Sequence, residues 1–208
     1  MDDGHRWAIE TFGEHGPWIR REIRRSVEEE HVASQRAQET SDHRSMRVYG
    51  QFYDGIAERF ERFGNVLGVP LVRPGHATYR VPVVNGVALF PWRFSSRPDG
   101  RIQTTLFATS EARIELTDLQ PRPVQGMLDL GLPDPELSDE ERSFLATLRA
   151  VETDPAVTNG SLVLVAIRSS VKGLHSVEWG EVRLVEGGRL EWFGFHEDLL
   201  ESPSWEAI

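Results

Sequence analysis

The chain of 208 residues contains no cysteine, which excludes disulfide bonds, thiolate zinc sites and cysteine nucleophiles. It also lacks any run of about 18 apolar residues, the length that a membrane-spanning helix requires. Residues 1–6 are polar and acidic, without the apolar segment of a secretory signal. We therefore expect a soluble, cytoplasmic protein with no membrane partner.

Lysine is nearly absent, since among 23 basic residues only Lys172 is a lysine. Codon usage of a GC-rich genome is the simpler explanation. A functional lysine is the alternative, because arginine does not titrate in a useful range. The formal net charge of −10 disfavours bulk binding to nucleic acid, which rewards positive charge through counterion release. A local basic patch is compatible with this balance.

Established catalytic and nucleotide-binding motifs are also missing. There is no Walker A loop, no Gly-x-Gly-x-x-Gly after a predicted strand and no Gly-x-Ser-x-Gly elbow. His196 and Glu197 are not followed by a second histidine at the spacing of a zinc-protease motif. The hydroxyls of Ser169 and Ser170 lie near Lys172, a pattern that hairpin loops also show. The sequence thus predicts neither a metal site nor a cofactor.

The length and the 39% hydrophobic content suit one domain, residues 1–208, with a sizeable core. Residues 1–66 are predicted as a helical part and residues 67–208 as a sheet part. The sheet part is expected to contain one helix near residues 138–152.

A first helix is predicted from Gly16 and Pro17 to about Glu39, because proline suits the first helical position. Its narrow apolar stripe consists of Ile19, Ile23 and Val27, with Trp18 beside it. Paired arginines and a following run of glutamates indicate a solvated face, or a contact with an acidic partner or phosphate.

A second helix is predicted from apolar residues that recur every three or four positions. The stripe consists of Met46, Tyr49, Tyr53, Ile56, Phe60 and Phe63. Ser41 or Asp42 is expected to cap its start and Gly64 to mark its end. Gly50 and Gly55 would each cost roughly 1 kcal/mol relative to alanine, so the stripe must pack well. Together the two helices predict a helical hairpin lying on a sheet.

Asn85-Gly86 between two apolar runs predicts a hairpin with a type I′ turn, which needs positive φ at both positions. One face of this first hairpin, expected to be core, carries Tyr79, Val81, Val83, Ala88, Phe90, Trp92 and Phe94. The other face carries Arg80, Pro82, Val84, Val87, Leu89, Pro91 and Arg93. Because Pro82 and Pro91 lack an N–H, we expect a bulge or an early end of the pairing.

Residues 101–107 and 113–116 are predicted as two further strands, and residues 121–139 as a loop. Ser138, with Glu141 three residues later, forms a capping box for the helix in this part of the chain.

Asn159-Gly160 predicts a turn before the apolar run 162–167, which is typical of a central strand buried on both faces. A second hairpin is predicted from Val177–Val185 and Leu190–Phe195, with its turn at Gly187-Gly188.

Pairing across that turn would separate two faces of the second hairpin. Val182, Leu184, Phe193 and Phe195 would face the core. The opposite face would carry Trp179, Glu181, Arg183, Trp192 and His196. Aromatic platforms beside these charged groups suit a planar or charged ligand, and Glu181 with His196 could form an acid–base pair. Packing of the aromatic residues beneath helices is the simpler explanation.

Arg80 and Arg93 share one face of the first hairpin, with His76 upstream. Two arginines there could clamp a phosphate or a carboxylate. Salt bridges to the many acidic residues are the simpler explanation.

The predicted fold is α+β, an N-terminal helical hairpin packed on a mainly antiparallel sheet of about six or seven strands, with one inserted helix. The absence of a catalytic motif favours a non-enzymatic binding or regulatory protein whose partner is a protein or a small ligand. The alternative is a hydrolase that acts on a phosphorylated or nucleic-acid-like substrate. Its candidate residues are Arg80, Arg93, Glu181 and His196.

Overall fold

The computed structural model describes residues 1–117, 138 and 162–201. Its helices are α1 (Asp3–Phe12), η1 (Gly13–His15), α2 (Gly16–Ser41), α3 (Arg47–Gly50), α4 (Phe52–Leu67), η2 (Ile102–Thr104) and α5 (Glu111–Thr117). Its strands are β1 (Leu71–Val72), β2 (Val81–Val84), β3 (Val87–Ser95), β4 (Leu162–Ser170), β5 (Gly173–Val185) and β6 (Arg189–Asp198). Across the described ranges, no helix is both long and apolar enough to span a membrane.

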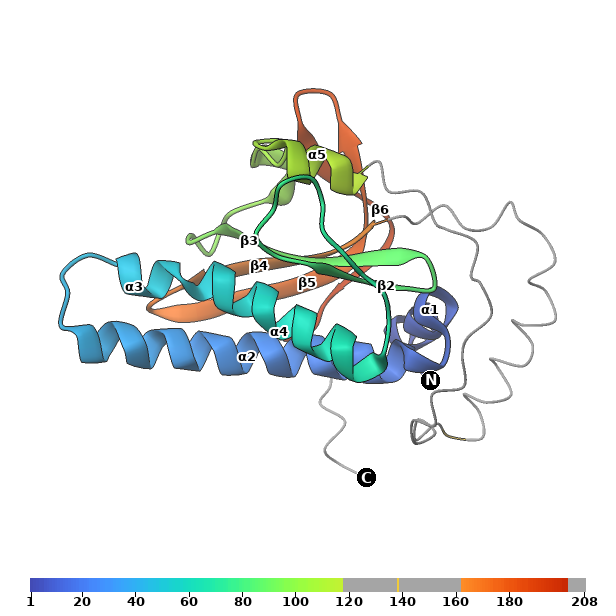
Figure 1. The fold of residues 1–208 in the computed structure, drawn as a ribbon, viewed down its shortest axis with the longest axis horizontal. Helices are drawn as coiled ribbons and strands as arrows, with labels where there is room; N and C mark the ends of the chain where they lie inside the picture. The colour runs from blue at the N-terminus through green and yellow to red at the C-terminus, as the bar shows by residue number, and fades with distance from the viewer. Residues whose placement is uncertain (118–137, 139–161, 202–208) are drawn as a thin grey trace.

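The six strands form one sheet in the order β1-β2-β3-β4-β5-β6. Neighbouring strands pair antiparallel except β3 and β4, which are parallel. Helices α2 and α4 lie together against one face of the sheet, and α5 lies on the opposite side (Figure 1). This arrangement confirms the predicted α+β class and the mainly antiparallel sheet.

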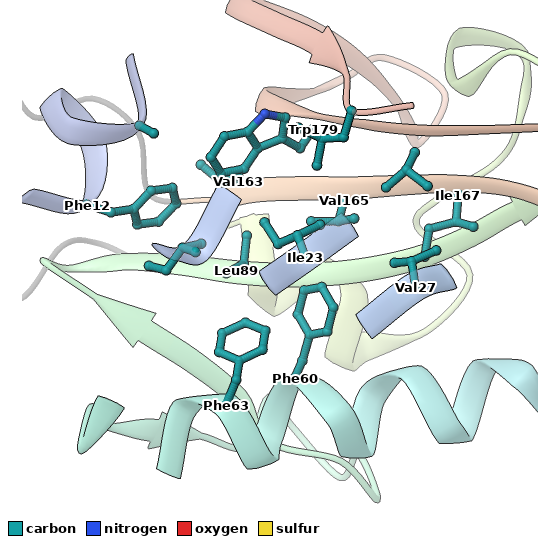
Figure 2. Close-up of a cluster of buried hydrophobic side chains, with 14 of the residues drawn as sticks. Phe12, Ile23, Val27, Phe60, Phe63, Leu89, Val163, Val165, Ile167 and Trp179 are labelled. Atoms are coloured by element: carbon teal, nitrogen blue, oxygen red, sulfur yellow. The ribbon is translucent and has the colours of Figure 1, made fainter. Parts of the chain in front are cut away.

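The sheet has a hydrophobic core on each face. On the helical side, apolar residues of α1, α2 and α4 pack against alternate residues of the strands (Figure 2). This cluster includes Phe12, Ile23, Val27, Phe60, Phe63, Leu89, Val163, Val165, Ile167 and Trp179. The opposite cluster includes Phe90, Trp92, Phe107, Leu116, Leu164 and Leu190. Strand β4 contributes to both clusters, which confirms it as a central strand.

The first hairpin has the predicted turn, since Asn85 and Gly86 have φ values of 50° and 79°. The prediction that only one of its faces is core is wrong. Val84, Val87 and Leu89 are also buried, because the N-terminal helices cover the second face.

The prolines shorten the pairing of this hairpin as expected. Strands β2 and β3 pair only at Val83–Ala88 and Val84–Val87. Pro82 pairs with Leu71 of β1 instead. A register shift between β3 and β4 follows at Arg93.

Two predicted strands are absent from the structure. Residues 101–107 form η2 and a single bridge from Leu106 to Arg189, and residues 113–116 belong to α5. The alternation of apolar and polar residues there is too short to distinguish a strand from one turn of helix. The predictions for residues 121–137, 139–152 and Asn159-Gly160 lie outside the described residues.

The predicted second helix is divided into α3 and α4 at Gln51. The Gln51 N–H donates to the Val48 carbonyl at 3.1 Å. This bond spans three residues, as in a 3-10 helix, and therefore changes which side chains of the following turn face the core. As a result Phe52 is fully buried, while Met46 of the predicted stripe is exposed.

The connection between α2 and α3 also differs from the expectation. Asp42 ends α2 in the left-handed region, with φ of 50°, instead of capping the second helix. Gln38 of α2 holds the connection: its amide nitrogen donates to the carbonyls of His43 and Ser45. Its amide oxygen accepts from the Tyr49 N–H at 3.0 Å, which fixes the start of α3.

A buried ion pair joins the helical layer to β6. The Arg20 guanidinium, on α2, donates to both carboxylate oxygens of Glu197 at 2.8 and 2.7 Å. The Trp179 indole N–H donates to the same carboxylate at 2.8 Å. Asp2 accepts a further bond from Arg20 at 3.3 Å. Only 6% of the Arg20 side chain is exposed, so its charge depends on these acceptors.

The substitution Glu197→Gln should therefore lower the free energy of unfolding by about 3 kcal/mol, because it leaves a buried guanidinium without its main carboxylate. The measurement is urea unfolding followed by tryptophan fluorescence. Glu191→Gln is the control on the same strand, because Glu191 pairs with the exposed Arg183 at 3.3 Å. It should change stability by less than about 1 kcal/mol. Equal effects of the two substitutions would contradict the role assigned to Glu197.

Candidate functional site

The second hairpin has a different register from the predicted one. Val185 pairs with Arg189, so the turn has three residues, with positive φ at Gly187 and Gly188. The sequence prediction used a two-residue turn. A slip of one residue moves every side chain of a strand to the other face of the sheet.

The five residues predicted to share one face are consequently divided between the two faces. Trp179 is fully buried in the helical-side cluster, and Glu181 is on the same side because it pairs with Val163. Trp192 and His196 lie on the opposite side, where their rings stack at 5.1 Å.

Glu181 and Arg183, two of these five residues, also differ in their environment. Burial raises the pKa of the Glu181 carboxyl. Arg183 is exposed, forms an ion pair with Glu191 and lies over the Phe193 ring. The structure therefore does not bring Glu181 and His196 together as an acid–base pair.

The two candidate arginines are likewise separated. Arg80 forms an ion pair with Glu61 of α4. Arg93 donates instead to Ser169 of β4 and lines a surface groove. They do not form a joint clamp on one ligand.

The groove around Arg93 is the most site-like feature of the described residues. It has a volume of about 690 Å³ and is lined by residues at the ends of β3 and β4, at the start of β5 and in α3. We call it the Arg93 groove. Its lining consists of Met46, Tyr49, Gly50, Arg93, Phe94, Ser95, Ser96, Pro98, Ser170, Val171, Lys172 and His175.

Arg93 is held in the groove by neutral groups. Its Nε donates to the carbonyl and to the hydroxyl of Ser169 at 3.1 and 3.0 Å, and its Nη2 donates to the carbonyl at 2.8 Å. The guanidinium also lies 5.3 Å from the centre of the Tyr49 ring. No ion pair to Arg93 is formed by any carboxylate of residues 1–117 or 162–201, so these contacts fix its position without neutralising its charge.

The tight connection from β4 to β5 adds two more groups. The Ser170 hydroxyl lies 3.2 Å from His175 Nε2 and accepts from the backbone N–H of Lys172 at 3.2 Å. The Lys172 side chain is exposed, and none of the described carboxylates forms an ion pair with it. Gln35 of α2 donates to the Val171 carbonyl at 2.8 Å and ties this connection to the helical layer.

A buried histidine lies behind the groove. His31 Nδ1 is 2.8 Å from the Tyr49 hydroxyl, and the two side chains are only 7% and 2% exposed. Burial lowers the pKa of His31, and the positive charges of His175 and Arg93 lower it further. Burial likewise raises the pKa of Tyr49. Both groups are therefore neutral near neutral pH.

The lining of the Arg93 groove contains an arginine, a lysine and a histidine but no carboxylate. This is unusual in a chain with 33 acidic residues and a net charge of −10. Such a set can hold an anion by charge-assisted hydrogen bonds. In the part of the chain that is described, no group of three or more metal-ligating side chains could hold a metal ion.

Sequence reasoning identified Arg93 but assigned it to the wrong partner, and it considered Lys172 only as an alternative to codon bias. The Ser169-Ser170 hydroxyls beside the single lysine were the usable signal. His175, His31 and the role of Tyr49 were missed, because the contacts that define them join distant segments.

Comparisons of the chain with protein-family models, with curated proteins and with solved structures found no match.

The neutral state of His31 predicts a pH effect on stability. Its pKa is lowered in the folded protein, whereas in the unfolded chain it is near 6.5. The unfolded chain therefore takes up the proton first, and stability should fall as pH drops below about 6.5, by about 1.4 kcal/mol for each unit of pKa difference. His31→Gln should reduce the loss of unfolding free energy between about pH 7 and pH 5.

The matched control is His76→Gln, the same substitution at an exposed position, and an equal effect of the two substitutions would contradict the role assigned to His31. Burial also lowers the pKa of His15, so this residue too makes the folded protein less stable as the pH falls. The His31→Gln variant should therefore keep part of the pH dependence of the unfolding free energy. Chemical-shift titration that placed the His31 pKa at or above 6.5 would contradict the assignment.

Proposed function

We propose that this protein is a binding protein for a small anionic ligand, which it holds in the Arg93 groove. One observation carries the proposal. The Arg93 guanidinium forms no ion pair with a described carboxylate, and it lies beside Lys172 and His175 in a groove whose lining contains no Asp or Glu. This proposal keeps the non-enzymatic binding function that the sequence favours and moves its site away from the second hairpin.

Four arginines outside the groove differ from Arg93 in their partners, whereas Arg113 resembles it, because Arg113 also contacts a hydroxyl, a carbonyl and aromatic rings. Arg20, Arg59, Arg80 and Arg168 each form an ion pair with a glutamate, as expected in an acidic protein. Arg93 has instead a carbonyl, a hydroxyl and an aromatic face as partners. None of the described carboxylates neutralises its charge, and its position is already fixed, which reduces the entropy lost on binding a ligand.

Binding can be measured by isothermal titration calorimetry with pyrophosphate, with acetate as a monoanionic comparison. Pyrophosphate should bind more tightly than acetate, and its affinity should fall as salt rises because the contacts are electrostatic. Lys172→Ala should weaken binding of pyrophosphate about tenfold, the typical effect of losing one hydrogen bond to a charged group.

Arg62→Ala is the control for this variant. Arg62 is an exposed arginine of α4, and its loss changes the net charge equally without touching the groove lining. It should leave the affinity unchanged. Absence of any pyrophosphate binding, or equal loss in both variants, would overturn the proposed function.

A hydrolase that acts on a phosphorylated substrate is the second candidate, favoured by the 3.2 Å contact between the Ser170 hydroxyl and His175 Nε2. A hydroxyl within hydrogen-bond reach of an imidazole is the arrangement of an activated nucleophile. Among the described residues, His175 has its hydrogen bond with Ser170 but none with a carboxylate that would orient its ring, so we prefer binding as the function.

Turnover of p-nitrophenyl phosphate by the wild-type protein, and a loss of at least about a hundredfold in the Ser170→Ala variant, would establish the hydrolase. The expected outcome is that neither protein releases p-nitrophenol above the buffer rate, while both bind pyrophosphate.

A further inference from the structure

The Arg93 groove combines its positive charge with apolar and open surface. Beside the charged groups it is lined by Met46, Phe94, Pro98 and Val171, and Met46 is 53% exposed. The Phe94 ring itself packs 5.5 Å from Trp92 in the cluster on the opposite face of the sheet, so the apolar side chains of the groove are those of Met46, Pro98 and Val171. A simple anion would not use this surface.

The size of the groove leads to the same conclusion. A volume of about 690 Å³ is in the range of pockets that bind drug-sized molecules and metabolites. An inorganic anion would fill only a small part of it.

Charge balance favours a phosphate over a carboxylate. Arg93 and Lys172 supply two positive charges, and His175 lies beside them in the lining. A phosphate monoester carries about −1.5 to −2 charges at neutral pH and has three terminal oxygens that accept hydrogen bonds. A single carboxylate would leave one of the two charges unbalanced.

Gly50 leaves the α3 side of the groove open. A Cβ atom built at this position would meet no other atom within 4 Å. Its backbone does not have a positive φ, so a side chain can be introduced without strain. This open surface lies beside Tyr49, whose ring contacts Arg93.

We propose that the ligand of the Arg93 groove is a phosphate monoester with a flat organic body, as in a mononucleotide. Its phosphate lies among Arg93, Lys172 and His175, and its ring packs on the surface formed by Met46 and Gly50. The inference rests on the proposed anion-binding function and adds to it the chemical class of the ligand.

The test compares adenosine 5′-monophosphate, ribose 5-phosphate and pyrophosphate by calorimetry on the full chain. Stacking of a base typically contributes enough to tighten binding about tenfold, so the nucleotide should bind that much more tightly than the sugar phosphate. Adenosine without phosphate should bind more weakly than either phosphate ester.

The substitution Gly50→Trp distinguishes the contribution of the ligand's ring from that of its phosphate. An indole at this exposed position should occupy the space of the ring, and it should weaken binding of the nucleotide about tenfold. Pyrophosphate should bind this variant as it binds the wild type, because the charged groups are unchanged. Gln103→Trp, at an exposed position in η2 outside the groove lining, is the matched control and should affect neither ligand.

The outcomes separate the two proposals. Equal affinities for nucleotide and sugar phosphate, or no effect of Gly50→Trp on the nucleotide, would overturn the inference while pyrophosphate binding still supports the anion site. Failure of all three compounds to bind the wild type would overturn the proposed function as well. Unfolding curves equal to that of the wild type check that the Gly50→Trp protein is folded.

Discussion

The carboxylate of Glu197 is the acceptor on which the assembly of helices and sheet depends. It receives the Arg20 guanidinium from α2 and the Trp179 indole from β5. Residues separated by 177 positions in the chain thereby share one buried charge pair. Removal of one buried partner costs far more than loss of an exposed ion pair, because the remaining charge stays out of water. Together with the apolar packing of Ile19, Ile23 and Val27, this contact joins α2 to the sheet.

The position of α2 in turn determines the Arg93 groove. Gln35 and Gln38 on its outer half bind the β4–β5 connection and the start of α3, respectively. Tyr49 is thus held against His31 on one side and Arg93 on the other. The groove is therefore supported by side chains that cannot be moved independently, which is the condition for a preorganised binding site.

The Arg93 groove differs from the surfaces on which arginines are paired with carboxylates. Several arginines elsewhere lie beside glutamates, as in the contacts of Arg59 with Glu29 and Glu30. Arg93 is positioned by neutral oxygens of Ser169 instead. A favourable local potential for an anion can thus exist in an acidic chain, because nearby charges dominate over distant ones that water and salt screen.

The sequence by itself determined the elements that depend on neighbouring residues. The Asn85-Gly86 turn, the start of α2 at Pro17 and the doubly buried strand 162–167 could be predicted, because backbone preference and hydrophobic period act between neighbouring residues. The α+β class follows from the same signals. The tertiary structure decided the face of each hairpin residue, since one additional turn residue at Gly187-Gly188 moved Trp192 and His196 across the sheet. It also decided the candidate site, because contacts such as Arg93 with Ser169 join segments that only folding brings together.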